Sequence, residues 1–314
     1  MCRSETILGL EQVDLVPGRE EPRGSDTGDA GADHGYSQGV LLPGEGTSVY
    51  ALRGDAHSRV YFPKRDGWTV IGTVRDPGRY SDTAWPGELF LERVDLAEPG
   101  SGRQLADRVI AAHGVPDVLL NNAGTLHFGP VEDEPPHVAE EVFRVNVLEP
   151  LELIRGLVPA MRDAGGGTIA NVTSVGGRLA FPLFTTYNVS KHALEGYSEG
   201  LWHELALSNI RAKAIEPGFV ETAIWDKSVR SRGGSPYEGS GPYAGAMATM
   251  AGFEGSIANR TTPQAAAEEI RSAILDSSDR LRYPVAAYAG ALIRARRVIG
   301  ELRVMRFFHK RWMG

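Results

Sequence analysis

From about Trp68 onward, short apolar runs alternate with longer amphipathic segments along the chain. Apolar runs rich in β-branched residues predict strands at 68–74, 89–94, 117–120, 167–173 and 210–216. Apolar positions at helical spacing predict helices at 105–112, 136–163, 186–207 and 262–275. Strands that alternate with helices pair in parallel, so the expected fold class is α/β, a Rossmann-like doubly wound parallel sheet with an irregular N-terminal segment.

The first 60 residues show no such periodicity. Residues 15–46 hold eight glycines and three prolines, a composition typical of an irregular segment. The pattern divides the chain into an irregular Gly/Pro-rich segment at 1–60, a Rossmann-like domain at 61–280 and a basic tail at 281–314. Within the domain, residues 223–262 are rich in Gly, Ser and aromatic residues and follow a strand end, so both a substrate lid and a plain surface loop fit them.

The C-terminal segment is basic. Residues 294–314 contain seven Lys or Arg and one Glu, interleaved with Leu, Val, Met and Phe. A docked C-terminal helix with a basic outer face explains this pattern, and so does a helix that touches a membrane or a partner.

The overall composition excludes several classes of protein. Apolar residues make up 42% and charged residues 23% of the 314 residues, which allows a sizeable core and is incompatible with a wholly disordered chain. The net charge of −7 disfavours nucleic acid as the main partner. The single cysteine, Cys2, excludes an intrachain disulfide framework and a cysteine metal cluster, and we expect no metal site. No apolar run is long enough for a membrane span and the N-terminus lacks the apolar stretch of a signal peptide, so we expect a cytoplasmic protein.

Glycine is over-represented, with 38 residues in the chain. Gly124, Gly176, Gly177 and Gly218 lie at predicted strand ends, where a cofactor or substrate could approach the backbone closely. The glycines crowded into 15–46 have the composition of a phosphate-binding loop without its spacing.

One pair of side chains suggests acid–base chemistry. Tyr187 and Lys191 are four residues apart on a predicted helix, which places both on one face. Because a nearby cation favours phenolate, this spacing predicts that the pKa of Tyr187 falls toward the range of an acid–base catalyst. Ser174 lies just after a predicted strand, and Asn146 lies inside a largely apolar helix, where an amide usually has a hydrogen-bonding task.

These residues, in this order, resemble the short-chain dehydrogenase/reductase family. The matching positions are Asp95, Asn121-Asn-Ala-Gly124, Asn146, Ser174, Tyr187-x-x-x-Lys191 and Pro217-Gly218-Phe-Val-Glu-Thr222. The resemblance covers about residues 67–280. It implies an NAD(P)-dependent oxidoreductase with a Rossmann-like fold, and a homo-oligomer built with the helices at 136–163 and 186–207.

The resemblance implies a role for each member of the catalytic set. Tyr187 would protonate a carbonyl oxygen during reduction and accept the proton during alcohol oxidation. Ser174 would hydrogen-bond that oxygen, and Lys191 would bind the nicotinamide ribose and lower the pKa of Tyr187. Asn146 would hold a water molecule that relays protons to Lys191.

The same resemblance implies a cofactor site along the strand ends. Asp95 and Leu96 would contact the adenine. The remaining cofactor positions would be Asn122, Ala123 and Gly124 near the ribose, Pro217, Gly218, Val220 and Thr222 near the nicotinamide amide, and Tyr187 with Lys191.

Charge after the strand at 68–74 favours NADP over NAD. No acid precedes Arg75, whose guanidinium could pair with a 2′-phosphate, whereas an acid there would bind the 2′-hydroxyl of NAD. Asp76 follows directly and weakens the preference, so NAD stays open. The alternative for Arg75 is an ordinary solvated loop arginine.

The phosphate-binding loop expected of this family is missing from the sequence. The family opens with a strand and a Thr-Gly-x-x-x-Gly-x-Gly loop, and no stretch of residues 1–67 has that spacing. The nearest candidate is a strand at 39–43 followed by Gly44-x-Gly46. Three explanations stay open: the N-terminal half-unit has diverged, it has been lost and leaves a non-catalytic binding protein, or the recorded reading frame is wrong before about residue 60.

The sequence therefore predicts an oxidoreductase that transfers a hydride between NADP(H) and an alcohol or carbonyl substrate. The predicted pocket residues suggest a bulky, apolar small molecule: Phe181, Phe184, Phe219, Trp225, Tyr237, Tyr243, Met247 and Phe253. Packing in the core or lid is the alternative for half of them. The rival function is a catalytically impaired binding or scaffold protein with a defective dinucleotide site.

Overall fold

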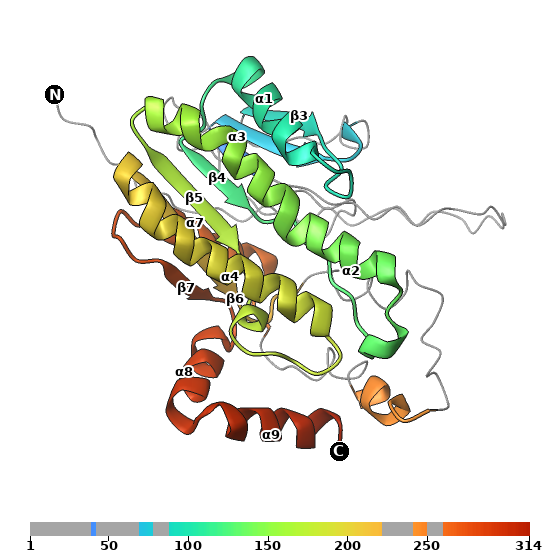
Figure 1. The fold of residues 1–314 in the computed structure, drawn as a ribbon. Helices are drawn as coiled ribbons and strands as arrows, with labels where there is room; N and C mark the ends of the chain where they lie inside the picture. Colours follow the sequence, from blue (N-terminus) through green and yellow to red (C-terminus); the bar gives the residue numbers. More distant parts are fainter. Residues whose placement is uncertain (1–38, 42–68, 78–87, 222–240, 250–259) are drawn as a thin grey trace, which may run out of the picture.

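A seven-stranded sheet forms the centre of the molecule (Figure 1). The computed structural model describes residues 39–41, 69–77, 88–221, 241–249 and 260–314. The strand order is β3-β2-β1-β4-β5-β6-β7. The strands are β1 (Gly39–Leu41), β2 (Thr69–Val74), β3 (Glu88–Arg93), β4 (Val118–Asn121), β5 (Gly167–Val172), β6 (Ile210–Pro217) and β7 (Arg282–Val285). Each pairing between neighbouring strands of the sheet is parallel except the two pairings of β1, and the predicted fold class is confirmed.

Helices pack on this sheet. They are α1 (Ser101–His113), α2 (Pro136–Phe143), α3 (Glu149–Asp163), α4 (Thr185–Leu205), α7 (Pro263–Leu275), α8 (Ala289–Ile299) and α9 (Glu301–Trp312). In Figure 1, α3 and α4 both cross the near face of the sheet, and α1 lies beside α3. The helix predicted at 136–163 is α2 and α3 joined by one stretch of π-helix, Arg144–Leu148.

Glycines allow α1 and α3 to approach closely. A Cβ on Gly102 would overlap the backbone oxygen of Glu149, and a Cβ on Gly156 would overlap the Cβ of Ala106. The Glu149 carboxylate accepts hydrogen bonds from the backbone nitrogens of Gly100 at 3.0 Å and Gly102 at 2.8 Å. Because these amides belong to the N-terminus of α1, the carboxylate caps that helix and its dipole from a neighbouring helix.

The main core lies between the sheet and these helices. Its fully buried strand residues include Leu119, Ile169 and Ile215, each with no exposed surface. On α4, Leu201 and Leu205 belong to this core, as the helical stripe predicted. Burial of these side chains is the main favourable contribution to folding.

The last predicted helix and the basic tail also take definite positions. Thr262 caps α7, its Oγ1 accepting a hydrogen bond from the Ala265 nitrogen at 3.3 Å. The sheet extends past the predicted boundary at residue 280, because β7 pairs in parallel with β6. Gly300, with φ of 90°, separates α8 from α9.

The strand β1 runs against its neighbours. Gly39 lies opposite Gly72 and Leu41 opposite Val70, so β1 ends beside the start of β2. The strand predicted at 39–43 is therefore present, but it does not point toward the edge where the parallel strands end. Residues 42–68, which include the candidate Gly44-x-Gly46, lie outside the described residues.

Candidate active site

The predicted site residues meet at one edge of the sheet. The strands β2 to β6 all run in one direction, because β1 is antiparallel to both β2 and β4. The carboxyl ends of these strands therefore lie at the same edge of the sheet. Arg75 follows β2, Asp95 follows β3, Asn122 follows β4, Ser174 follows β5 and Gly218 follows β6.

The side chains of Ser174 and Tyr187 lie together at Gly176. Ser174 has extended backbone and only 9% exposure, and its Oγ accepts a hydrogen bond from the Gly176 nitrogen at 2.9 Å. The Tyr187 side chain is close enough to Ser174 for hydrogen bonding with it to lower the pKa of the phenol. A Cβ on Gly176 would lie 3.2 Å from Tyr187 Cε1 and 3.3 Å from Ser174 Oγ. The predicted close approach at Gly176 is therefore made by the Tyr187 ring and the Ser174 hydroxyl.

The pKa of Tyr187 moves opposite to the prediction. Burial raises it above the ordinary value of a phenol, and the hydrogen bond with Ser174 only partly opposes this. The Lys191 ammonium donates to the Val172 carbonyl oxygen at 2.8 Å and lies 5.8 Å from the centroid of the Tyr187 ring. The predicted fall in the pKa of Tyr187 is wrong for this arrangement, because desolvation of the phenolate dominates.

Lys191 is itself buried, with 4% exposure. Burial lowers the pKa of Lys191 to about 8, although the carboxylate of Glu195 one turn away opposes the shift. A Cβ on Gly124 would lie 3.5 Å from Lys191 Nζ and 3.3 Å from Asn146 Oδ1. The ammonium thus lies against the end of the Asn121–Gly124 segment.

Asn146 is held in the π-helical stretch between α2 and α3. Its Oδ1 accepts from the Thr125 nitrogen at 2.8 Å, and its Nδ2 donates to the Thr125 oxygen at 2.8 Å and to Ser190 Oγ at 2.9 Å. The side chain therefore ties the segment after β4 to α4, and π-helical turns of this kind often occur at functional sites. Pro150 has no N–H, so the Asn146 carbonyl lacks the usual donor four residues on.

A buried amide chain supports the same region. Asn121 Nδ2 donates to Asn171 Oδ1 at 2.8 Å, and Asn171 Nδ2 donates to Ser198 Oγ at 3.0 Å. The three residues come from β4, β5 and α4, and each is at most 2% exposed. Sequence analysis missed Asn171 and Ser198, although a polar residue in an otherwise apolar strand or helix face is a usable signal.

Arg75 and Asp95 meet at the far end of this edge. Arg75 Nη1 lies 3.9 Å from Asp95 Oδ2, and Asp95 Oδ1 accepts from the Ala97 nitrogen at 2.9 Å. Leu96 has no exposed surface and its side chain belongs to the core. Only its backbone is available for the predicted adenine contact.

The segment after β6 is fixed by backbone hydrogen bonds. The Gly218 nitrogen donates to the Val285 oxygen at 2.9 Å, and the Phe219 nitrogen donates to the Ala287 oxygen at 3.1 Å. A Cβ on Gly218 would overlap the Ala287 oxygen. Glycine at this position therefore allows contact with the strand β7 region rather than contact with a ligand.

Some of the remaining predicted positions lie among the described residues and others lie outside them. Pro217 ends β6, and Val220 pairs with Thr261. Outside the described residues lie Thr222 and three predicted pocket residues, Trp225, Tyr237 and Phe253.

The other predicted pocket residues form an apolar wall beside Tyr187. Phe181, Tyr243 and Met247 are partly buried and pack against a second buried cluster that contains Phe184. Phe181 lies 6.2 Å from Phe219 between ring centroids. Phe184 is only 3% exposed, so packing is its main role.

Comparison with known proteins agrees with this arrangement. A short chain dehydrogenase family model matches residues 81–233. An uncharacterized oxidoreductase of Schizosaccharomyces pombe is 31% identical over 229 residues, which cover 72% of this chain and 93% of that protein. The chain belongs to the short-chain dehydrogenase/reductase family.

Further relatives agree with this assignment. The uncharacterized oxidoreductase YbbO of Escherichia coli is 30% identical, covering 75% of this chain and 83% of that protein. The crystal structure of a short-chain dehydrogenase from Streptomyces avermitilis aligns with a TM-score of 0.64 and 29% identity, covering 78% of this chain and 86% of that one. The short-chain dehydrogenase/reductase fold is thus shared along most of the chain.

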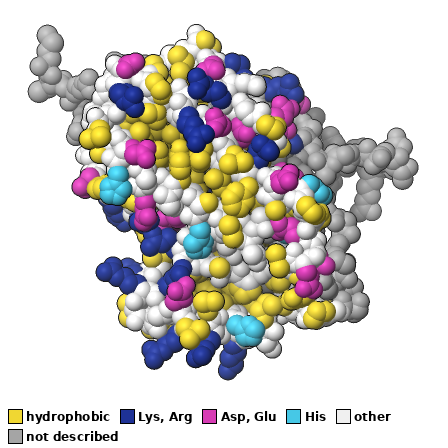
Figure 2. Space-filling view, in the orientation of Figure 1, with side chains coloured by type: hydrophobic (Ala, Val, Ile, Leu, Met, Phe, Trp, Pro, Cys, Tyr) yellow, Lys and Arg dark blue, Asp and Glu magenta, His cyan; other side chains and the backbone are white. Residues whose placement is uncertain are grey.

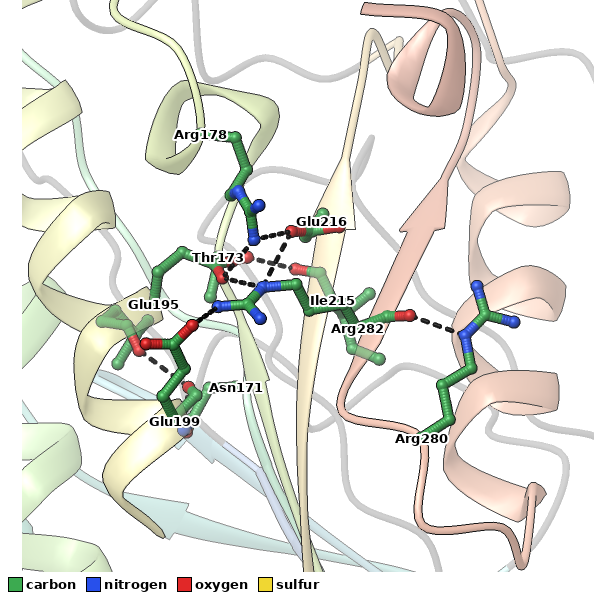
Figure 3. Close-up of polar contacts among 11 residues, drawn as sticks. Asn171, Thr173, Arg178, Glu195, Glu199, Ile215, Glu216, Arg280 and Arg282 are labelled. Atoms are coloured by element: carbon green, nitrogen blue, oxygen red, sulfur yellow. Dashed lines mark hydrogen bonds and ion pairs between the residues drawn. The ribbon is translucent and has the colours of Figure 1, made fainter. Parts of the chain in front are cut away.

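This short-chain dehydrogenase/reductase also holds a cluster of acids and arginines that sequence analysis missed (Figure 3). Glu195 and Glu216 are 4% and 1% exposed. Arg178 Nη1 lies 3.3 Å from Glu216 Oε1 and 3.7 Å from Glu195 Oε2. Arg282 Nε lies 2.9 Å from Glu195 Oε2 and 3.6 Å from Glu216 Oε1, and its Nη2 pairs with Glu199.

The members of this cluster lie close in sequence to the predicted site residues. Arg178 follows the turn after Ser174, Glu195 lies one turn after Lys191, and Glu216 precedes the Pro217-Gly218 pair. Burial and the charge of Glu195 raise the pKa of Glu216 to about 7, while both arginines oppose the shift. No spacing rule finds such a set, because its members come from four separate segments.

Proposed function

We propose that this protein transfers a hydride between NADP(H) and the alcohol or carbonyl group of a bulky, apolar small molecule. The observation that carries the proposal is the contact between Ser174 and Tyr187 at the carboxyl edge of the sheet, with Lys191 buried beside it. A hydroxyl pair on a rigid strand end and helix is suited to hold and protonate one substrate oxygen.

The described part of the site fits a nicotinamide dinucleotide. Gly124 has no side chain to fill the space beside Lys191 Nζ, so a ribose can approach the ammonium there. Asn122, Ala123 and Gly124 would border that ribose, and Asp95 with the backbone of Leu96 would contact the adenine. The nicotinamide amide would face Pro217, Val220 and the backbone of Gly218, while Thr222, the remaining predicted contact, lies outside the described residues.

A bound dinucleotide supplies or accepts the hydride. The raised pKa of Tyr187 keeps its phenol protonated at neutral pH, which suits donation of a proton to a carbonyl oxygen. Ser174 Oγ would donate a hydrogen bond to the same oxygen as negative charge develops there. Lys191 would hold the ribose hydroxyls, and a water on the free side of the Asn146 carbonyl would relay protons to it.

The decisive experiment combines cofactor binding with one substitution. We expect saturable binding of NADPH by fluorescence, and a Tyr187→Phe variant that binds equally well but loses at least about a hundredfold in kcat for carbonyl reduction. Tyr197→Phe is the matched control, because Tyr197 lies on the same helix away from Ser174. Retained turnover in Tyr187→Phe would remove the acid–base role.

The lack of a recognisable phosphate-binding loop favours one rival, a binding or scaffold protein with a defective dinucleotide site. Titration separates the two functions directly. Saturation by NADPH or NADH at micromolar levels supports the enzyme, and no binding up to millimolar levels supports the rival.

The preference for NADP is assigned to Arg75. Its guanidinium reaches to 3.9 Å from Asp95 at the adenine end, where a 2′-phosphate would lie. Arg75→Ala should weaken NADPH binding about tenfold or more while changing NADH binding little. Arg103→Ala, an exposed arginine on α1, is the control. Equal losses for the two cofactors would contradict this assignment.

A further inference from the structure

The C-terminal helices present a surface of exposed apolar side chains. Twelve large hydrophobic residues in the described parts of the chain are exposed, and five of them lie between residues 298 and 307. These five are Val298, Ile299, Leu302, Met305 and Phe307, with 80%, 47%, 57%, 56% and 62% exposure. Such a concentration is more than single exposed apolar residues scattered over a surface would give.

The same surface is strongly basic. Residues 294–314 hold seven Lys or Arg and one Glu, a net charge of +6 in a chain whose total is −7. The single acid, Glu301, already pairs with Arg296. The positive charge is therefore concentrated on a segment of an otherwise acidic protein, which points to an anionic partner.

The helix α9 has a buried apolar face and an exposed basic face. Val304, Phe308 and Trp312 recur every four residues and are buried against the body of the protein. Arg303, Arg306 and Lys310 recur every three or four residues on the outer side and are exposed. The helix is already anchored by its buried face, so its outer face is available for another surface.

The two helices lie at an outer edge of the molecule. Figure 1 shows α8 and α9 below the sheet and its covering helices. In the same orientation, Figure 2 shows Lys and Arg side chains next to hydrophobic ones along this lower edge. Both helices therefore lie at the periphery of the described fold in this view.

We propose that α8 and α9 dock this protein on the surface of a bilayer that contains anionic lipid. Exposed Leu, Ile, Met and Phe side chains mixed with arginines are the pattern of a helix that lies in the membrane interface, with apolar groups inserted and cations at the phosphates. In the part of the chain that the structure describes, no helix combines the length and apolar character needed to cross a bilayer.

Docking would also bring the proposed pocket close to the lipid. The ring centroids of Phe308 and Trp312, on the inner side of α9, lie 5.2 Å and 5.8 Å from the ring centroid of Phe181. Phe181 belongs to the apolar wall beside Tyr187. This step rests on the proposed function, since it assigns bilayer-dissolved alcohols or carbonyls as the substrate class. The docking itself does not depend on catalysis.

Cosedimentation of the full-length protein with vesicles tests the docking. We expect binding to vesicles of equal parts phosphatidylcholine and phosphatidylserine, at least about tenfold weaker binding to phosphatidylcholine alone, and weakening with added salt. A triple variant, Arg303→Glu, Arg306→Glu and Lys310→Glu, should lose at least about tenfold in affinity for the mixed vesicles. The matched control reverses three exposed arginines elsewhere: Arg103→Glu, Arg108→Glu and Arg155→Glu.

A second variant tests the apolar contribution. Leu302→Ser, Met305→Ser and Phe307→Ser change exposed positions and should weaken the binding that persists at high salt. Equal binding to both vesicle types, no binding, or unchanged binding by the charge-reversed variant would overturn the proposal. The proposal would also be overturned if either triple variant lost self-association in sedimentation velocity while its vesicle binding stayed unchanged, since the surface would then contact a second copy of the protein. None of these readouts uses substrate, so loss of the proposed activity is a separate result.

Discussion

At the level of single residues, the lysine beside the tyrosine is set up differently from what its spacing suggests. Lys191 and Tyr187 share one face of α4, yet the ammonium donates to the Val172 carbonyl and the phenol contacts Ser174. A spacing of four residues places two side chains on a face but does not fix which partner each selects. Burial then determines the direction of both pKa shifts.

The lowered pKa of Lys191 makes a prediction about cofactor binding. With a pKa of about 8, Lys191 is charged at neutral pH and loses its proton as the pH rises through that value. A charged donor makes stronger hydrogen bonds than a neutral one, so NADPH affinity should fall about three- to tenfold between about pH 7 and pH 9. Fluorescence titrations of wild type and Lys191→Met measure this. The variant should bind weakly with little pH dependence, and an equal slope in both proteins would contradict the prediction.

Glycines show how much of the site is packing. Gly124, Gly176, Gly177 and Gly218 were expected where a ligand approaches the backbone. The structure places side chains or backbone of the protein itself at Gly176, Gly177 and Gly218, with Tyr187 against the first. Of these positions, Gly124 is the one beside the Lys191 ammonium, which is proposed to hold the cofactor ribose.

At the level of elements, the hydrophobic periodicity of the sequence predicts where the helices lie. The irregular stretch that joins α2 to α3 depends instead on contacts with other elements. The segment predicted as one helix contains a π-helical stretch at Arg144–Leu148, where Asn146 turns toward Thr125 and Ser190. Helical periodicity does not report one extra residue in a turn, because the apolar stripe continues on both sides.

The contact between α1 and α3 gives a prediction about stability. Gly102→Ala should destabilise the protein by about 1–3 kcal/mol, because its Cβ would overlap the Glu149 oxygen and lie 3.0 Å from the Leu153 nitrogen. Gly196→Ala on α4 is the matched control. No atom lies within 4 Å of a Cβ there, so the helix should gain up to about 1 kcal/mol. Urea unfolding measures both, and equal effects of the two substitutions would contradict the packing argument.

At the level of the whole molecule, the acid–arginine cluster joins distant parts of the chain around the site. Arg178, Glu195, Glu216 and Arg282 connect the segment after β5, the middle of α4, the end of β6 and the start of β7 (Figure 3). Two acids sharing two arginines in a buried place cost desolvation free energy, which is recovered only while the geometry is kept. The cluster is therefore suited to fix the position of Ser174 and of the Pro217-Gly218 pair relative to α4.

The pKa of Glu216 predicts a pH dependence of stability. A carboxyl whose folded-state pKa is raised to about 7 binds more protons in the folded than in the unfolded state, so its contribution to stability falls as pH rises from about 4.5 to about 7. Relative to wild type, Glu216→Gln should therefore gain stability between pH 5.5 and pH 8, by at most about 2 kcal/mol. Urea unfolding at both pH values measures the difference.

Glu199→Gln serves as the control for this experiment. Glu199 pairs with Arg282 at the exposed end of the cluster, and the hydrogen bond from Arg282 lowers its pKa. Its stabilising contribution is lost only at more acidic pH, so this variant should show no comparable change over the same interval. A similar slope in both variants would show that Glu216 is not the titrating group.

The sequence by itself determined the alternation of strands and helices, and it singled out Ser174, Tyr187, Lys191 and Asn146 as the candidate catalytic set. Hydrophobic period, helix caps and short spacings are local properties of a chain, so they can be read without the structure. Tertiary structure alone decided that β1 runs antiparallel, that Asn171 and Ser198 support Asn121, and that Glu195 and Glu216 share two arginines. These features depend on segments far apart in the chain, and on burial, which sets hydrogen-bond partners and pKa values only once the segments have packed together.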